Sequence, residues 1–215
     1  MKQAPPPVVA ALDTETGGFN PERFSILSFA MVLFNNTGGP AAEISFFVAE
    51  PDIFAEPDAL AINRIDLKWL ATHGASVSTA ARLVSDFVSA NCDIEAGQRI
   101  MLAGHNVAFD VAFMRRLFRL ANVEYGRLFS HRTIDTAGIL QFLSMCGKLP
   151  AREWSSTAAF EHFGIVVPAG ERHTALGDAR ATSRLLAEMV DLAGNPTPLV
   201  KRARQSTRPN KKQGS

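Results

Sequence analysis

The sequence predicts an α/β fold in which a mixed β-sheet is covered by helices. The first fifty residues contain short apolar, β-rich segments joined by turns, which is typical of hairpin-connected strands. Further along, short apolar strands alternate with segments of helical periodicity, which is typical of parallel strands joined by helices. With 215 residues, 47% of them hydrophobic, the chain can bury a full core, and this length favours a single domain.

The first strands are predicted from apolar runs that end in turn residues. Residues 8–12 form a short apolar strand that leads into the sequence DTETGG. Residues 26–34 and 43–48 are rich in β-forming residues, and the sequence NNTGGP between them is typical of a tight turn. We therefore expect these two segments to pair as an antiparallel hairpin.

The later part of the chain combines two short strands with several helices. An apolar strand is expected at residues 100–103, followed by the sequence GHNVAFD, and a last short strand at 133–135. Helices are expected at residues 58–74 (as short helices), 77–90, 111–121, 137–145, 157–163 and 179–193. Together these elements predict an antiparallel hairpin combined with parallel strands and flanked by helices.

Charge is unevenly distributed, which separates a domain at residues 1–194 from a basic tail at 195–215. The net charge is only +1, but the tail holds six of the 22 basic residues and none of the 21 acidic ones. Its proline, serine and basic residues predict disorder. Two interpretations stay open for the tail: an aid to solubility, or an arm that binds the phosphate backbone of a nucleic acid.

Composition also bears on the cellular compartment. The longest apolar run, residues 26–34, contains Ser28 and is far shorter than the ~20 residues of a membrane-spanning helix. The N-terminal sequence MKQAPPPVV lacks the apolar region of a secretory signal. Cys92 and Cys146 have no metal-type spacing, so we expect two reduced, buried thiols. These features predict a cytoplasmic protein with no membrane partner.

Two carboxylates stand at the end of the first strand. Asp13 and Glu15 are two residues apart, and side chains two apart leave the same face of a strand. Such a pair on an exposed edge would simply be solvated. The preceding sequence VVAAL is wholly apolar, however, which favours a central strand. Two like charges held this close repel unless a cation lies between them.

Two further acids stand where helices begin. Asp110 follows the strand at 100–103, and Asp178 lies at the start of the helix at 179–193. Each alone could be an ordinary N-terminal helix charge. Together with the first pair they are four acids at strand ends or helix starts, where α/β sheets build their sites. Hard oxygen ligands suit two Mg²⁺ ions, or Mn²⁺, and an ion pair can clamp a phosphate during in-line displacement.

The sequence ERHTALGD places His173 five residues before Asp178. Inside one helix these two side chains would lie roughly 140° apart and could not serve one site. We therefore expect His173 on a loop that precedes the helix and is loosened by Gly170, so that the acid is fixed while the base can move. The ordinary pKa of histidine lies near neutrality, which suits a base that takes a proton from an attacking water.

With these residues assembled, the sequence resembles the DEDDh 3′-to-5′ exonucleases, which include ribonuclease T and the proofreading subunits of DNA polymerases. The motifs DTET, GHNVAFD and HTALGD occur in the family order, and the likeness runs over about residues 8–193. It implies a ribonuclease H-like fold. It also implies that Asp13 bridges both ions, that Glu15 and Asp178 complete one ion site, that Asp110 supports the other, and that His173 is the catalytic base.

The resemblance further implies an enzyme that releases nucleoside 5′-monophosphates from single-stranded or frayed 3′ ends. DNA is the expected substrate and RNA the alternative. A homodimer, as in ribonuclease T-like relatives, or docking on a polymerase would be the expected protein partnership. The alternative function is a catalytically idle nucleic-acid-binding or polymerase-accessory module of the same fold.

Substrate contacts are assigned to a second group of residues. Thr16 and Gly17 are expected to bring hydroxyl and backbone donors close to the terminal sugar, and Phe19 is expected to stack on a base. His105 and Asn106 are expected to orient either the bound strand or the Asp110 carboxylate. His105 fits a purely structural role equally well. Ile62 stands where ribonuclease T-like sequences are expected to carry an aromatic residue. Trp69 and Trp154 are expected in the core.

Three arginines follow Asp110 on the predicted helix at 111–121, namely Arg115, Arg116 and Arg119. They could approach the phosphates of a bound strand. The simpler interpretation is the solvated face of a helix, and we favour it.

Overall fold

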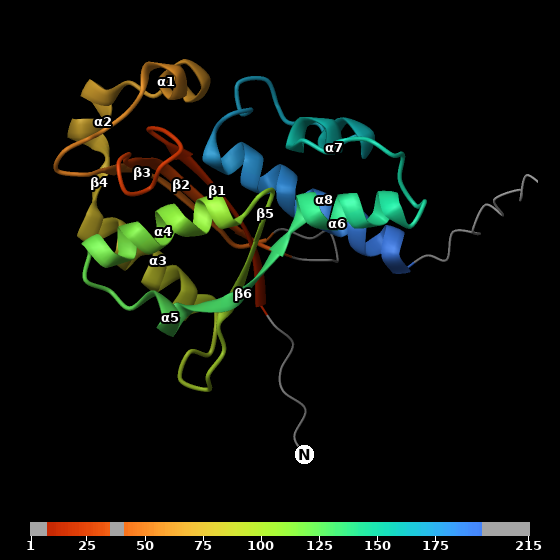
Figure 1. The fold of residues 1–215 in the computed structure, drawn as a ribbon. Helices are drawn as coiled ribbons and strands as arrows, with labels where there is room; N and C mark the ends of the chain where they lie inside the picture. The colour runs from red at the N-terminus through yellow and green to blue at the C-terminus, as the bar shows by residue number, and fades with distance from the viewer. Residues whose placement is uncertain (1–7, 35–40, 195–215) are drawn as a thin grey trace, which may run out of the picture.

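A computed structural model describes residues 8–34 and 41–194. Six strands form one sheet in the order β4-β3-β2-β1-β5-β6, with helices on both of its faces (Figure 1). The strands are β1 (Val8–Thr16), β2 (Ile26–Leu33), β3 (Glu43–Ala49), β4 (Ala75–Ser76), β5 (Ile100–Gly104) and β6 (Phe129–Asp135). The predicted turn NNTGGP and the predicted tail at 195–215 lie outside the described residues.

Eight helices are present among the described residues. They are α1 (Pro57–Asn63), α2 (Leu67–His73), α3 (Val77–Asn91), α4 (Ala108–Leu120), α5 (Tyr125–Leu128), α6 (Thr136–Met145), α7 (Ser156–His162) and α8 (Ala175–Gly194). None of these helices combines the length and the apolar character needed to cross a bilayer.

The pairing of the strands confirms the predicted fold class. Strands β1, β2 and β3 pair antiparallel, whereas β5 pairs parallel with both β1 and β6. Strand β1 extends four residues beyond the predicted strand at 8–12, because β2 continues to pair with it up to Thr16. Asp13 and Glu15 therefore belong to the strand itself and not to a turn that follows it.

The two faces of the sheet pack against different helices. Phe29 and Met31 of β2 belong to the large core beneath α3 and α4, whereas the alternating residues Ala30 and Val32 pack with the first turns of α8. This alternation follows from the two-residue period of a strand. Strand β1, which pairs with β2, thus lies between α4 on one face and α8 on the other (Figure 1).

Two positions that were predicted to be buried, Trp69 and Cys146, prove to be exposed. Trp69 is 43% exposed and lies in an aromatic cluster on the surface, 5.0 Å from Phe47 and stacked on His73 at 4.8 Å. Helix α2 is only two turns long and buries a single residue, Leu70, so its tryptophan has no core to enter. Trp154 is buried, as predicted. Both cysteines are free, but Cys146 is exposed and only Cys92 is buried.

Candidate active site

The face alternation of β1 brings Asp13 and Glu15 to the helix α8. Asp13 lies directly opposite Ala30 in the β1–β2 pairing, and Ala30 packs against α8. Glu15, two residues on, shares that face. Asp178 lies in the first turn of α8 and is 7% exposed. One carboxylate oxygen from each of these three acids lies within 4.8 Å of the other two.

Asp110 reaches the same strand from the opposite side. It lies in the first turn of α4, buried, and its Oδ1 accepts hydrogen bonds from the Thr14 N–H at 2.9 Å and the Thr14 hydroxyl at 2.7 Å. The pairing of β5 with β1 ends at Ala11, so Asp110 binds β1 beyond the point where its parallel neighbour stops. Asp110 is outside the group of three oxygens, but its charge acts on Asp13.

Burial, reinforced by the charges of neighbouring acids, raises the pKa of three of these carboxyls, those of Asp13, Glu15 and Asp110. The pKa of Asp13 is raised well above its usual range by burial and then by Asp110, Asp178 and Glu15. Burial, with the charges of Asp178 and Asp110, raises the pKa of Glu15 to about 8. Burial raises the pKa of Asp110 to about 7, against the lowering effect of its bonds from Thr14. These three groups ionise together near neutral pH only if cations compensate their charge.

The donor set fits divalent cations. The oxygens are carboxylate oxygens, which Mg²⁺ and Mn²⁺ prefer. Moreover, Asp178 Oδ1 is buried and has no hydrogen-bond partner within the described part of the chain, and an unpaired buried carboxylate oxygen is costly unless a cation binds it. Asp13, Glu15 and Asp178 can therefore hold an ion, with Asp110 beside them.

Arg172 also belongs to the site, although no motif in the sequence indicates it. Its Nη1 pairs with Asp178 Oδ2, and its Nη2 donates to Ser156 Oγ at 3.1 Å and Thr157 Oγ1 at 2.9 Å at the start of α7. Its guanidinium also lies 5.5 Å from the centre of the Phe160 ring. The only sequence feature that could have indicated a role for Arg172 is its position next to His173. Its partners on α7 are 15 and 16 residues away in the sequence.

His173 lies on the loop before α8, as predicted, with a left-handed φ of 62° and an exposed side chain. It lines a cavity of about 240 Å³ together with Glu15, Phe47 and Trp69, so that its ring and a site carboxylate border one space. The loop is anchored nearby: a Cβ on Gly177 would lie only 2.1 Å from the Glu171 carbonyl oxygen. The approach to His173 is therefore packed onto α8, rather than simply loosened by Gly170.

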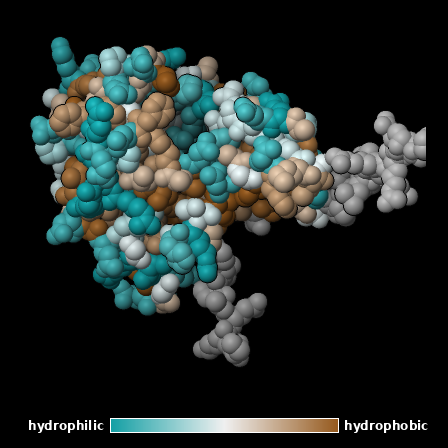
Figure 2. Space-filling model, viewed as in Figure 1, coloured by the Kyte–Doolittle hydropathy of each residue, from teal (hydrophilic) through white to brown (hydrophobic). Residues whose placement is uncertain are grey.

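Glu15 also lines a second cavity. This cavity, called the Phe19 pocket below, has a volume of about 220 Å³. The residues that line it are Thr14, Glu15, Thr16, Gly18, Phe19, Glu56, Asp58, Ala59, Ile62, Asn63 and Phe109. Phe19 is 85% exposed and meets Phe109 edge to face, with ring centres 6.3 Å apart. Figure 2 shows a hydrophilic hollow between the regions of α1 and the start of α8.

The remaining predicted substrate residues differ in what they can offer. The Gly17 N–H already donates to the Ser25 carbonyl at 2.8 Å, and the Thr16 hydroxyl donates to the Gly18 carbonyl at 2.9 Å. Gly17 is instead required for close packing, because a Cβ there would lie 2.1 Å from the Phe54 carbonyl oxygen. Thr16 still lines the Phe19 pocket.

His105 and Asn106 lie in the turn between β5 and α4. His105 is half-buried, with Nδ1 3.1 Å from the Thr136 hydroxyl, and burial lowers its pKa. Asn106 has a left-handed φ of 59°, and its N–H donates to Asp135 Oδ1 at 3.1 Å while its side chain is exposed. These contacts connect the turn to the end of β6 through Asp135 and to the start of α6 through Thr136.

The solvated face expected for the three arginines of α4 holds for Arg115 and Arg119, but not for Arg116. Arg116 pairs with the buried Glu50, Arg119 pairs with Glu22, and the Arg115 guanidinium lies 4.4 Å above the Tyr125 ring. Arg115 and Arg119 remain exposed, and only Arg116 is half-buried against its partner.

Comparison with known proteins decides the family. A family model described as exonuclease, RNase T, matches residues 10–186, most of the chain. The chain belongs to the RNase T exonuclease family. This exonuclease is 29% identical over 202 residues to ribonuclease T of Yersinia enterocolitica and 27% identical to ribonuclease T of Escherichia coli, with 89% of each chain covered in both comparisons. The resemblance to the DEDDh exonucleases and the expectation of an enzyme are confirmed at this level.

Solved structures confirm the fold. The nuclease domain of 3′hExo, a DEDDh family member bound to rAMP, superimposes with a TM-score of 0.68 at 18% identity, covering 86% of this chain and 92% of that one. Exonuclease I of E. coli, in complex with a dT13 oligonucleotide, gives a TM-score of 0.65 at 20% identity over 85% of this chain. This chain aligns with only 41% of the longer exonuclease I chain.

Proposed function

We propose that this exonuclease removes nucleoside 5′-monophosphates from the 3′ ends of single-stranded or frayed DNA. The observation that carries the proposal is the position of the Phe19 pocket. It shares Glu15 with the group of three carboxylate oxygens, so a terminal nucleoside in the pocket would place its phosphate beside the acids. A pocket lined by aromatic rings accepts any base, because every base has a face that can stack.

Asp13, Glu15, Asp178 and Asp110 would hold two divalent ions, Mg²⁺ or Mn²⁺. Such ions stabilise the negative charge that develops on the attacking and leaving oxygens of the phosphate. The protein's own contribution is to fix the carboxylates: β1 presents Asp13 and Glu15, α8 presents Asp178, and Thr14 orients Asp110. The raised pKa values of Glu15 and Asp110 agree with sites that exchange protons for cations.

His173 would take the proton from the attacking water. It borders the same space as Glu15, and its loop is fixed on α8 through Gly177. General-base catalysis requires an imidazole close to the water that it deprotonates, and a packed loop holds it at a defined place. With all five residues of the DEDDh set present, nothing in the described chain favours the idle accessory module.

The decisive experiment is digestion of one oligonucleotide labelled either at its 5′ end or at its 3′ end. Removal from the 3′ end yields a ladder from the 5′-labelled strand and a single labelled nucleotide from the 3′-labelled strand. The reaction should need Mg²⁺ or Mn²⁺ and should stop with EDTA and in Asp13→Asn. Shortening from the 5′ end, or internal cleavage, would refute the proposal.

Substrate class and partnership are tested with matched reagents. Single-stranded and duplex DNA and RNA of the same sequence, digested in parallel, would show whether DNA is preferred; faster digestion of RNA would reassign the substrate. A chain without residues 195–215 should show a weaker dependence of affinity on salt if the tail binds phosphates, and an unchanged one if it only aids solubility. Light scattering would measure the molar mass in solution and so test the expected homodimer. The cytoplasmic location stays a prediction.

A further inference from the structure

We propose that the buried ion pair between Glu50 and Arg116 sets the width of the Phe19 pocket and is thereby a positioning element for the terminal base. This inference rests on the proposed function, because it assigns the pocket to the 3′-terminal nucleotide. Neither residue touches that pocket. Their effect is transmitted through two walls, the segment that carries Phe19 and the helix that carries Phe109.

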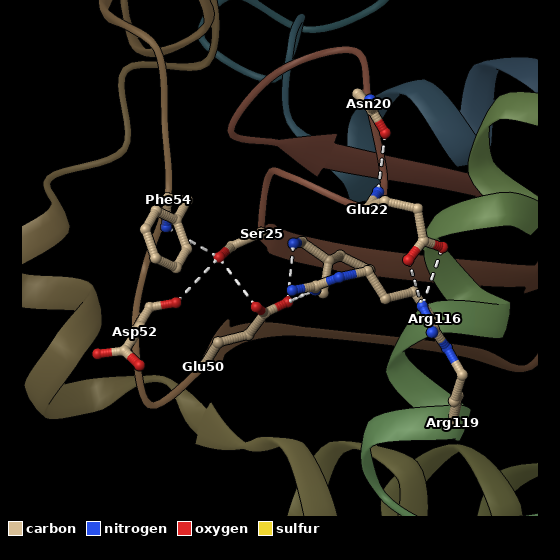
Figure 3. A network of polar contacts seen from close by, with 9 residues as sticks. Asn20, Glu22, Ser25, Glu50, Asp52, Phe54, Arg116 and Arg119 are labelled. Atoms are coloured by element: carbon tan, nitrogen blue, oxygen red, sulfur yellow. Dashed lines mark hydrogen bonds and ion pairs between the residues drawn. The ribbon is translucent and has the colours of Figure 1, made fainter.

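Glu50 is the centre of the network in Figure 3. It follows β3 directly, is 5% exposed, and uses both carboxylate oxygens. Oε1 accepts from the Ile26 N–H at 3.2 Å and pairs with Arg116, while Oε2 accepts from the Ser25 hydroxyl at 2.9 Å. A carboxylate this deeply buried is tolerated only with its partners in place, so the positions of these groups are closely linked.

Ser25 transmits this constraint to the first wall of the pocket. Its N–H donates to the Phe54 carbonyl at 3.0 Å, its hydroxyl accepts from the Phe54 N–H at 3.0 Å, and its carbonyl accepts from the Gly17 N–H at 2.8 Å. Gly17 in turn accepts from the Glu56 N–H at 2.7 Å. Gly18, Phe19 and Glu56, which line the pocket, are therefore attached directly to the backbone that Ser25 holds.

Arg116 transmits the constraint to the second wall. Phe109 and Arg116 are seven residues apart on α4, so they lie on the same face of the helix two turns apart. Phe113 lies between them, fully buried, with its ring centre 5.0 Å from that of Phe109. The ion pair between Arg116 and Glu50 thus holds this face of α4, and Phe109 at its start, against the segment that carries Phe19.

A second link between the same two walls provides the natural control. Arg119, one turn along α4, donates to both carboxylate oxygens of Glu22 at 2.9 and 2.8 Å. Both of these side chains are more than 60% exposed, whereas those of Arg116 and Glu50 are 13% and 2% exposed. An exposed pair is weakened by solvent and salt, so it constrains the walls far less than the buried pair does.

The test compares two oligonucleotides that differ only at the 3′ end, one with a terminal base and one with an abasic terminal residue. The variants are Arg116→Lys, which keeps the charge but loses the planar fork, and Glu50→Gln. Arg119→Lys is the matched control, and Phe19→Ala is the benchmark for a lost stack. The measured quantity is a ratio: kcat/KM for the oligonucleotide with a terminal base, divided by kcat/KM for the oligonucleotide with an abasic terminal residue.

In Arg116→Lys and Glu50→Gln this ratio should fall about fivefold or more toward that of Phe19→Ala, as expected when the stacking of one base is weakened. Arg119→Lys should keep the wild-type ratio. A variant that is merely less stable would lower both rates together and leave the ratio unchanged, and that result would overturn the proposal. So would an equal effect of Arg119→Lys.

Calorimetric titration with thymidine 5′-monophosphate and Mg²⁺ repeats the comparison without turnover. The nucleotide should bind more weakly to Arg116→Lys and Glu50→Gln than to the wild-type protein and Arg119→Lys. Equal binding to all four, or no binding to the wild type, would overturn the role of the ion pair. If the wild type digested neither oligonucleotide, the proposed function would fail while this titration still decided the inference.

Discussion

Arg172 binds one carboxylate oxygen of Asp178 while the other oxygen of that carboxylate is buried and has no hydrogen-bond partner among the described residues. The arginine is itself held by two hydroxyls at the start of α7. One oxygen of the carboxylate is therefore fixed, and the other is available to bind a cation. The carboxylate belongs to a group of acids whose like charges repel one another.

Replacing Arg172 by Met should move the pH dependence of metal binding to higher pH. The positive charge of Arg172 lowers the pKa of Asp13 and of Glu15, so without it both carboxyls keep their protons to a higher pH. Because an ion must displace these protons, Mn²⁺ titrations at a series of pH values would show the shift. Arg172→Lys, which keeps a positive charge, should stay near the wild type. If the pH midpoint of Mn²⁺ binding in Arg172→Met stayed the same or moved to lower pH, the electrostatic role of Arg172 would be contradicted.

The metal-free protein should become less stable as the pH rises from about 4 to about 8. Glu15 has a folded-state pKa of about 8 against an ordinary value of 4.5, so in this range the folded state binds more protons than the unfolded state and stability falls with pH. Glu15→Gln should remove part of this loss and stabilise the metal-free protein at pH 8, by on the order of 1–3 kcal/mol.

Thermal unfolding in EDTA at several pH values measures this effect, and added Mg²⁺ should reverse the loss in the wild type but less so in the variant. A metal-free protein that is most stable at pH 8 would show that the carboxylates are not crowded as described.

His173→Ala should lower kcat by about 10²–10⁴-fold, the usual contribution of a general base. Its side chain is exposed, so stability should change little. Metal binding and single-strand affinity should also remain, which separates this variant from Asp13→Asn, where metal binding is lost. The kcat of His173→Ala, measured at saturating oligonucleotide, tests the role; an undiminished kcat would exclude it.

Gly177→Ala should impair the enzyme although alanine normally favours a helix. The added Cβ would meet the Glu171 carbonyl oxygen at 2.1 Å and displace the loop that carries His173. We expect a loss of stability of about 1–3 kcal/mol together with a reduced kcat. Gly138→Ala is the matched control, because nothing lies within 4 Å of the new Cβ on α6 and the change should stabilise by up to about 1 kcal/mol. Chemical denaturation and kinetics of both variants, compared side by side, would show whether the loop is packed as described.

The sequence allowed the local elements and much of the candidate site to be predicted, because both depend on short-range patterns. Alternation and turn chemistry predicted the β2–β3 pairing, and the two-residue spacing of Asp13 and Glu15 predicted a shared face. The five-residue spacing of His173 and Asp178 correctly excluded a common helix. The predicted burial of Trp69 was wrong, because periodicity does not reveal whether a helix has a neighbour to cover it.

What the sequence determined by itself was therefore the set of reactive groups and the element on which each one stands. Only the tertiary structure decided which distant groups meet: Asp110 with Thr14, Arg172 with Ser156, and Glu50 with Arg116. These contacts depend on which face of β1 each helix covers and on how closely loops approach glycine backbones. Such relations arise from the packing of segments up to 96 residues apart, which no local pattern encodes.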